Sequence, residues 1–373
     1  MHDRRKPPAA HGRRWAAQNQ TMPREGSTVN RKAFRRDNHY VSLSYLKRWT
    51  STENRVWAYR LLVSHPNVPL WKQASARGLA YHAHLYTRVV ATGHTDEVER
   101  WLDSDFETPA EDAIQKAVAD ARLTTQDWSR LIRFLAAQDV RTPARLMEML
   151  QRWHRTLPKI VEDTLEKSVQ EFKTAKREGR PIGRNSHVDS TNFPSRVTTE
   201  TVPGEEGGTL RFETVAGRSL WLFSLKHLLT GTVNSLLAHK WTILRSPEGI
   251  EWVTSDDPVV RLNYHDPNRY DFGGGWGSPG TEIFLPLSPR HLLYTKIGTR
   301  PPRRGEVVSA ELAGWFQRFV IEHAHRFVFA TAPDASVSRL RPRTVDAEAF
   351  ADEVEQWRRW HEEQSAAEQD LNQ

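Results

Sequence analysis

The amino-acid sequence predicts an α+β fold, with a helical N-terminal half packed with a mainly antiparallel sheet from the C-terminal half. Helical periodicity dominates after about residue 62, and the period becomes strand-like after Leu237. Hydrophobic residues make up 38% of the 373 residues and include 14 Trp, enough for a substantial core. We expect a disordered basic arm over 1–36, one α+β body over 37–345 with an insertion or long connection at about 178–216, and an acidic C-terminal helix over 346–373.

The basic arm accounts for the whole positive excess of the chain. It holds ten Lys and Arg against two Asp and Glu, a net charge of +8, whereas the whole chain carries +7. The 29 residues from Val345 onward hold nine Asp and Glu against two Arg, so the intervening body is +6. The arm has no hydrophobic periodicity, so it cannot bury enough apolar surface to offset its ordering entropy. The body is only mildly basic, unlike a dedicated DNA-binding module.

Composition excludes several classes of protein. Without Cys there is no disulfide framework, thiolate zinc site or cysteine nucleophile, which leaves His, carboxylate and hydroxyl chemistry. The N-terminus has arginines but no apolar core, so it is not a signal peptide. The most apolar stretch, 220–237, contains Lys226, His227 and Asn234, which favours a buried helix over a membrane span. We expect a cytoplasmic protein of bacterial type with no membrane role.

Helix signals are clear before residue 178. A short helix over 43–49 and a strand over 55–62 lead into a helical region of more than a hundred residues. Thr95 caps one helix, and Thr108 with Pro109 restarts it as a capping box. The next helix carries a core-facing stripe at Trp128, Leu131, Ile132 and Leu135 and stops near Arg141. Thr142 and Pro143 cap the helix after it. That helix buries Leu146, Met149, Leu150 and Trp153. A further polar helix spans about 157–176.

Strand-like patterns follow residue 178. The insertion contains a short hairpin around 209–215, and the apolar helix over 220–237 threads the centre of the body. Segments 241–245 and 250–254 flank a Ser-Pro-Glu-Gly turn. Strands near 282–285, 292–296 and 326–330 follow, with a helix near 309–322 between the last two. The final helix frays beyond Trp360.

His39 and Tyr40 lie where the arm meets the fold. A His beside a Tyr at this point is a candidate general acid or base, because its proton equilibrium lies near neutral pH. The alternative is a half-buried His bonded to backbone. Tyr40 is a candidate substrate-binding residue.

Gln138, Arg141 and Arg145 fall on adjoining turns of consecutive helices. An Arg there can offer its five donors to a phosphate or carboxylate, or it can pair with a structural carboxylate such as Asp139. Glu107, before the proline restart, is expected to face the same cavity.

Asp256 and Asp257 follow a strand and precede Pro258. Successive side chains of an extended segment point to opposite sides, so at most one of the two is expected to reach a given metal ion. The alternative is an Asx turn that ends the strand.

His227 and Asn234 are seven residues apart and therefore share one face of the apolar helix. They are candidates for substrate binding, or they are satisfied by backbone or water. The glycine-rich segment 273–280 lacks the Lys-Ser/Thr of a phosphate loop, and the sequence has no nucleophile elbow, His-Glu-x-x-His helix or kinase motif set.

Four short motifs, in this order, resemble the largely bacterial domain-of-unknown-function family 4238. They are Asn38-His39-Tyr40-Val41 with Tyr45-Leu46, Gln138 with Arg141-Thr142-Pro143, Trp241 with Thr254-Ser255-Asp256-Asp257-Pro258, and Pro286-Leu287-Ser288-Pro289. The resemblance spans about 38–330, although Ser42-Leu43 stands where a proline is expected. It implies no established activity, but it suggests that these scattered residues belong to one site.

Three functions are compatible with these residues. The first is a metal-dependent, nuclease-like hydrolase of phosphodiesters. In it Asp256, Asp257 and Glu107 supply ligands for Mg²⁺ or Mn²⁺, His39 moves a proton, and Gln138 and Arg141 complete the catalytic site. The second is a non-catalytic protein whose basic arm attracts nucleic acid or another polyanion. The third is an interaction or scaffold protein, a homo-oligomer in which the acidic helix of one copy binds the arm of the next.

Overall fold

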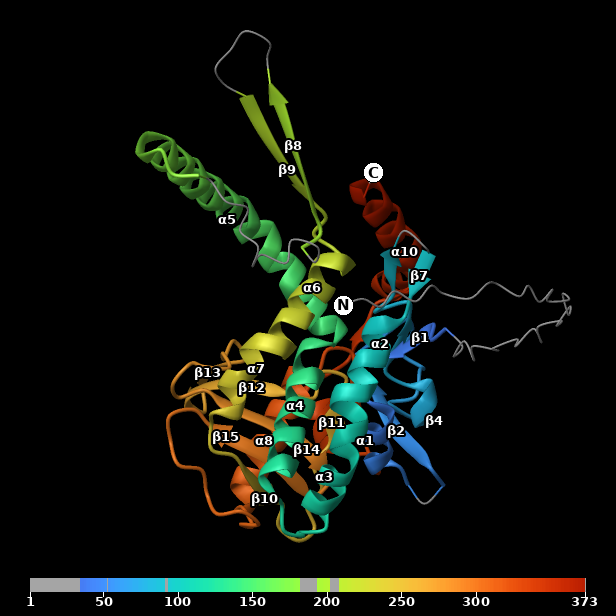
Figure 1. Ribbon diagram of the computed structural model, residues 1–373. Helices are drawn as coiled ribbons and strands as arrows, with labels where there is room; N and C mark the ends of the chain where they lie inside the picture. Colours follow the sequence, from blue (N-terminus) through green and yellow to red (C-terminus); the bar gives the residue numbers. More distant parts are fainter. Residues whose placement is uncertain (1–33, 52, 91–92, 182–192, 202–207, 373) are drawn as a thin grey trace, which may run out of the picture. The chain divides into compact units, whose positions relative to one another are not determined.

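The computed structural model describes residues 34–51, 53–90, 93–181, 193–201 and 208–372 (Figure 1). Nearly all of the predicted basic arm therefore lies outside the described residues. The chain divides into two units, 1–34 and 35–373, and all the elements below belong to the second unit.

Helices make up 47% of the structure and strands 23%. The α-helices are α1 (Leu43–Leu46), α2 (Glu97–Leu102), α3 (Thr108–Val118), α4 (Thr125–Val140), α5 (Pro143–Glu178), α6 (Arg218–His227), α7 (Val233–Leu237), α8 (Ala310–His323), α9 (Ala335–Leu340) and α10 (Ala347–Asn372). Two 3-10 turns, η1 (Lys47–Trp49) and η2 (Ala76–Gly78), and two π-helical turns, η3 (Asp103–Glu107) and η4 (Leu228–Thr232), complete the helical set among the described residues.

Two larger antiparallel sheets organise the described part of the body. The five-stranded sheet has the order β10 (Thr242–Arg245), β15 (His291–Lys296), β14 (Glu282–Ser288), β12 (Val260–Asp266), β13 (Arg269–Asp271). The four-stranded sheet has the order β11 (Thr254–Ser255), β16 (Phe327–Ala330), β2 (Arg55–Arg60), β4 (Trp71–Ser75). Four two-stranded pairs are also present: β1 (Asp37–His39) with β5 (Tyr81–Ala83), β3 (Leu62–Val63) with β17 (Thr344–Val345), β6 (Arg88–Val90) with β7 (Gly93–Thr95), and β8 (Ser195–Thr201) with β9 (Gly208–Thr214).

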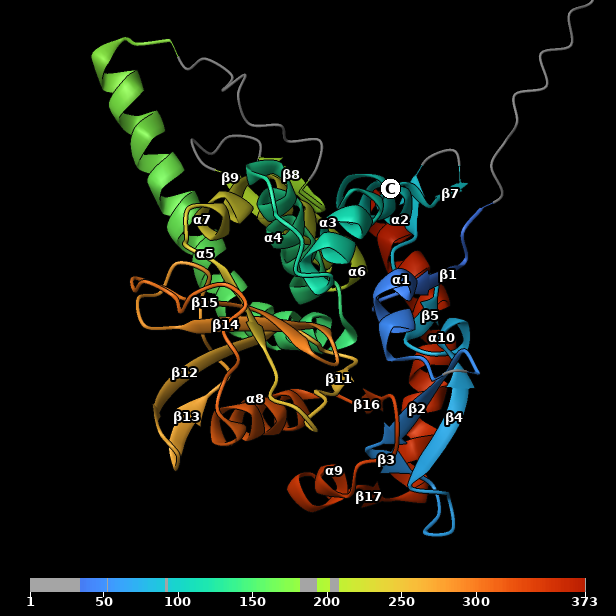
Figure 2. The same ribbon diagram turned by 90° about the horizontal axis from the view of Figure 1, so that it is seen from below.

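The five-stranded sheet has a hydrophobic cluster on each face. Ile283 and Leu285 belong to the larger cluster, which includes the apolar faces of α3, α4, α6 and α7. Phe284, between them in sequence, packs instead with Phe316 of α8 in a second cluster. This alternation follows from the two-residue period of a strand, and it makes β14 a central strand buried on both faces. In Figure 2 the strands of this sheet lie together near α8, and β2 and β4 lie with α10.

The prediction of a helical half and a sheet half is wrong, because helices and strands alternate along the chain. The four-stranded sheet pairs β2, near the start, with β16, near the end. The region after residue 62 also contains β4, β5, β6 and β7 before α2 begins at Glu97. Antiparallel strands can pair across any sequence separation, so local periodicity does not reveal their partners.

Several helix boundaries are confirmed and others are not. α4 ends at Val140 with Arg141 as its C-cap, and Thr142 caps α5 by accepting the backbone N–H of Arg145 at 3.4 Å. The helix restart at Thr108 and Pro109 is confirmed, because α3 begins at Thr108. The capping box is absent, since the hydroxyl of Thr108 donates to Asp103 and the π turn η3 continues directly into α3. The predicted helix over 157–176 is the outer part of α5, which passes through Pro158 without ending.

The apolar segment 220–237 is helical but is not buried on every side. Trp221, Leu225 and Leu229 are buried, whereas His227 and Asn234 are exposed. The predicted buried polar stripe is therefore a solvent-facing stripe. No helix in the described part of the chain is both long enough and apolar enough to cross a membrane.

The segment predicted to form a short hairpin, 209–215, supplies only one strand of a longer hairpin, in which β9 pairs with β8. The segments around the Ser-Pro-Glu-Gly turn enter different sheets, since β10 pairs with β15 and β11 with β16. The last helix, α10, does not end at Trp360 but continues to Asn372. Its distal part is held by Glu368, whose two oxygens accept from Arg218 Nε at 3.0 Å and Nη2 at 2.8 Å.

Candidate functional site

Arg141 lies at the junction of α4 and α5, and its side chain is fully buried. Its Nε donates to the carbonyl of Tyr40 at 3.0 Å, and its Nη2 donates to the carbonyl of His39 at 2.9 Å. Its Nη1 pairs with Glu107, at the end of η3. Arg141 therefore joins β1, η3 and the α4–α5 junction, and the guanidinium has little capacity left for a ligand.

Gln138 and His39 also act on backbone groups. Gln138 Oε1 accepts the N–H of Ser42 at 3.1 Å, and its Nε2 is buried without a partner among the described residues. The ring of His39 donates from Nε2 to the carbonyl of Arg77 at 3.2 Å. Burial lowers the pKa of His39. Tyr40 is buried, and its ring stacks on His82.

Asp256 is buried and accepts two backbone hydrogen bonds. Its Oδ1 accepts the N–H of His325 at 2.9 Å, and its Oδ2 accepts the N–H of Arg326 at 2.8 Å. Burial raises the pKa of Asp256 to about 7, although these hydrogen bonds act in the opposite direction. Both oxygens are thus occupied in fixing the turn between α8 and β16.

Asp257 is also buried, but its side chain contacts the first turn of α5 instead of the turn after α8. Its Oδ1 accepts from the hydroxyl of Thr142 at 2.9 Å, and its Oδ2 lies 3.1 Å from Arg145 Nη2. His323 Nδ1 lies 2.9 Å from the carbonyl of Asp257, so this nitrogen carries the proton. His323 Nε2 can then accept from Arg145 Nη2 at 2.7 Å, and burial lowers the His323 pKa to about 3.

A cavity of about 190 Å³ adjoins this cluster. Arg145 Nε lies 3.3 Å from Asp139 Oδ1, and Arg261 Nε lies 3.5 Å from the same oxygen. Glu148 pairs with both arginines, and Asp139 Oδ2 accepts from Trp276 Nε1 at 2.7 Å. Four of the charges lining this cavity therefore already have opposite partners: Asp139, Arg145, Glu148 and Arg261.

The structure thus brings most of the sequence motifs together. His39, Tyr40, Glu107, Gln138 and Arg141 meet on one side of the α4–α5 junction, and Asp257 and Arg145 meet on the other. Asp256 adjoins them through the backbone. His227 and Asn234 stand apart as exposed side chains. Among the described residues, no group of three or more His, Asp and Glu side chains is placed to hold a metal ion.

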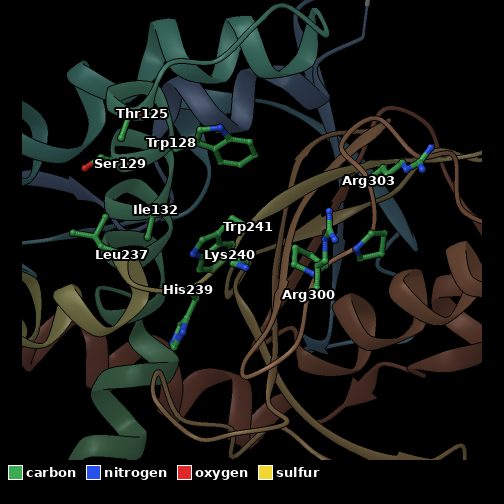
Figure 3. Close-up of a pocket in the computed structure, with 12 residues that line it drawn as sticks. Thr125, Trp128, Ser129, Ile132, Leu237, His239, Lys240, Trp241, Arg300 and Arg303 are labelled. Atoms are coloured by element: carbon green, nitrogen blue, oxygen red, sulfur yellow. The ribbon is translucent and has the colours of Figure 1, made fainter.

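A larger cavity, of about 620 Å³, opens elsewhere on the body (Figure 3). Its walls come from the first turns of α4, the segment between α7 and β10, and the loop after β15. The lining residues are Thr125, Trp128, Ser129, Ile132, Leu237, His239, Lys240, Trp241, Arg300, Pro301, Pro302 and Arg303. We call this cavity the tryptophan pocket, because Trp128 and Trp241 are its largest side chains.

Hydrogen bonds hold the wall of the tryptophan pocket in place. Trp241 Nε1 donates to the carbonyl of Leu236 at 2.9 Å, and His239 Nε2 donates to the carbonyl of Trp276 at 2.7 Å. The guanidinium of Arg304 lies 6.0 Å from the ring centroid of Trp128 and donates to the carbonyl of Ala121 at 2.6 Å. These contacts fix both indole rings while leaving each one partly exposed.

The pocket is electropositive. Lys240, Arg300 and Arg303 are exposed, and none of them has an ion-pair partner in the described parts of the chain. No carboxylate is among the lining residues. Sequence reasoning missed this site. The signal was available in Arg300-Pro-Pro-Arg303-Arg304 and in His239-Lys240-Trp241, where cations flank prolines and an aromatic ring.

Fold and site together define an α+β protein with a buried polar junction and a separate cationic, tryptophan-lined pocket. The profile of the family described as "Protein of unknown function (DUF4238)" matches residues 37–334. The chain belongs to this family, as the order of its motifs indicated. No curated protein and no solved structure matched the sequence.

Proposed function

We propose that this protein binds single-stranded nucleic acid through the tryptophan pocket. The observation that carries the proposal is the combination of two partly exposed indole rings with three unpaired cations and no lining carboxylate. Bases stack on aromatic side chains, and Lys and Arg attract the phosphates between them. A volume of about 620 Å³ also lies within the range of small-molecule sites.

The choice of single strands over duplexes rests on the aromatic rings. A duplex hides the faces of its bases, whereas a single strand can turn a base onto Trp128 or Trp241. The cations at Lys240, Arg300 and Arg303 come from two different segments around the pocket. They are therefore placed to contact a backbone that passes across the opening.

Hydrolysis of phosphodiesters by a metal ion at Asp256 and Asp257 has less support. Both oxygens of Asp256 accept backbone N–H groups, and those of Asp257 contact Thr142, Arg145 and His323. A divalent ion would have to displace these partners before it reached either carboxylate. The guanidinium of Arg141, likewise, faces backbone carbonyls and Glu107.

The binding test uses a fluorescein-labelled dT12 strand and its duplex with dA12, titrated with the full chain. We expect Trp241→Ala to weaken binding of the single strand by about 5- to 150-fold, because one stacked base contributes about 1–3 kcal/mol. Lys240→Glu should lower the slope of log Kd against log salt by about 0.7. Fluorescence anisotropy measures both quantities.

Two control variants lie outside the pocket. Trp315→Ala removes a partly exposed indole of α8, and Lys72→Glu reverses an exposed charge on β4. Equal affinities for Trp241→Ala and Trp315→Ala would rule out the pocket as the binding site. The same strands, incubated with Mg²⁺ or Mn²⁺ and run on a denaturing gel, test the nuclease alternative: cleavage that Asp256→Ala abolishes would favour it.

A further inference from the structure

The outer part of α5 carries an apolar stripe, of which only Ala175 is buried. The first turns of α5 pack on the body through Leu146, Met149 and Trp153, and Ala175, near the other end of the helix, is also buried. Beyond them α5 lies apart from the sheets in both views (Figures 1 and 2). Val169 is 47% exposed and Phe172 is 52% exposed.

The stripe has the spacing of a coiled-coil seam. Val161, Leu165, Ser168, Phe172 and Ala175 follow one another at alternating intervals of four and three residues. Such a heptad pattern places all five on one side of the helix. With a rise of 1.5 Å per residue, the seam extends for about 21 Å, or roughly four turns.

Charges on the outer part of α5 mostly change sign along the helix. Glu162, Asp163 and Glu166 precede the centre of the seam and Lys173, Lys176 and Arg177 follow it, whereas Lys167 and Glu171 run against this trend. None of these six side chains has an ion-pair partner among the described residues. A pairing in the same direction would set like charges against each other, and an opposite direction would set acids against bases.

Three residues fix the register of such a pairing. Glu162, Val169 and Lys176 are seven residues apart and occupy the same flank of the seam. When two copies of α5 run in opposite directions with Val169 beside Val169, Glu162 of each helix faces Lys176 of the other. The same register sets Phe172 opposite Ser168, a large side chain opposite a small one. In this register the C-terminal end of each helix, at Gly179, lies opposite Val161 of the other. The paired segment therefore stops short of Trp153, where α5 packs on its own body.

We infer that the outer part of α5 is a dimerisation surface, and that its occupant is the α5 of a second copy of this chain, bound in the antiparallel direction. The inference does not depend on the tryptophan pocket, which lies on other elements.

The experiment measures the oligomeric state of the full chain by sedimentation equilibrium in about 50 mM salt. We expect a dimer for the parent protein. Glu162→Lys and Lys176→Glu should each raise the dissociation constant by roughly tenfold, because each change replaces two attractive pairs per dimer with two repulsive ones. The double variant Glu162→Lys/Lys176→Glu should restore the parent value.

A mixture of the two single variants provides a second readout. One variant has Lys at both positions and the other has Glu at both, so the mixed dimer recovers two attractive pairs and should form in preference to either self-pair. Asp163→Lys and Arg177→Glu are the matched controls, because they reverse the same charges on the opposite face of the helix. They should leave the dissociation constant within about threefold of the parent value.

Phe172→Glu should give a monomer whose unfolding temperature is unchanged, since Phe172 has no place in the core of the body. A parent chain that is monomeric at every concentration would overturn the inference. A dimer that Phe172→Glu leaves intact, or a double variant no tighter than the single ones, would also overturn it.

Discussion

Arg141 is a fully buried charge whose contacts are all with other parts of the fold. Its guanidinium contacts two backbone carbonyls and one carboxylate from segments that are about 30 and about 100 residues away in sequence. Lys could supply charge at this place but not a planar fork of donors aimed at three partners. The residue type is therefore dictated by geometry as much as by charge.

We predict that Arg141→Met lowers the free energy of unfolding by about 3–5 kcal/mol, because it leaves the half-buried Glu107 and two backbone carbonyls without their partner. Urea unfolding followed by tryptophan fluorescence measures this loss. Arg155→Met, at an exposed position of α5, should change the same free energy by no more than about 0.5 kcal/mol. A similar loss in both variants would show that the Arg141 contacts carry no special weight.

The sequence indicates which residue types stand at helix junctions and strand ends, but it does not indicate the direction in which each side chain points. Gln138, Arg141 and Asp257 come from separate sequence motifs, and the structure places them around one junction. Whether an Arg faces a ligand or a carbonyl depends on the segment across from it, here β1. That partner is chosen by the fold and leaves no local pattern in the sequence.

At the scale of elements, α10 is held to the body partly by stacked imidazole rings. The ring centroids of His84 and His361 lie 3.8 Å apart, and that of His94 lies 4.9 Å from His361. Arg218 of α6 donates to His361 Nδ1 at 2.9 Å, and Arg36 adds a further positive charge nearby. Burial, followed by the charges of His84 and Arg218, lowers the pKa of His361 to about 4.

This arrangement predicts that acid loosens α10. The pKa of His361 in the folded chain is below its ordinary value of 6.5, so the unfolded chain binds more protons between these values. Stability contributed by neutral His361 is therefore complete above pH 6.5 and is lost as the pH falls toward 4. His361→Gln, which keeps an acceptor for Arg218, should reduce the drop in the urea midpoint between pH 7.5 and pH 5. His154→Gln, at an exposed site, should show the parent's full drop.

Caps and stripes explain why some elements were predictable and others were not. Thr142 with Pro143 marks the start of α5, because a hydroxyl cap and a residue without N–H both suit a first turn. Thr108 with Pro109 has the same local pattern and α3 begins there, yet no side chain caps this helix, because the π turn before it continues directly into α3. One extra residue in a helical turn is a tertiary adjustment that periodicity does not register.

At the scale of the whole molecule, one buried ion pair links α6 to the distal part of α10. Arg218 is fully buried and donates to both oxygens of Glu368 and to Ser365. The last helix is thereby tied to the segment that enters the centre of the body. An acidic, mostly polar sequence gave no local sign of this attachment.

We predict that Glu368→Ala lowers the free energy of unfolding by about 3–5 kcal/mol, since it leaves the Arg218 charge buried without its carboxylate. The double variant Arg218→Met/Glu368→Leu should recover most of this loss, because no unpaired charge remains. Glu362→Ala, at an exposed site on the same helix, is the control. Thermal unfolding monitored by circular dichroism compares the four proteins, and a double variant as weak as Glu368→Ala would contradict the prediction.

The pairing of β2 with β16 has a consequence for synthesis on the ribosome. Arg60 pairs with Phe327, so one edge of β2 stays unpaired until about 270 further residues have been synthesised. At about 5–20 residues per second this interval is roughly 14–54 s. During that time the edge of β2 exposes unpaired backbone groups to any other nascent strand nearby. Ribosome-bound chaperones that shield the first third of this chain would thus do more for its yield than those that act after release.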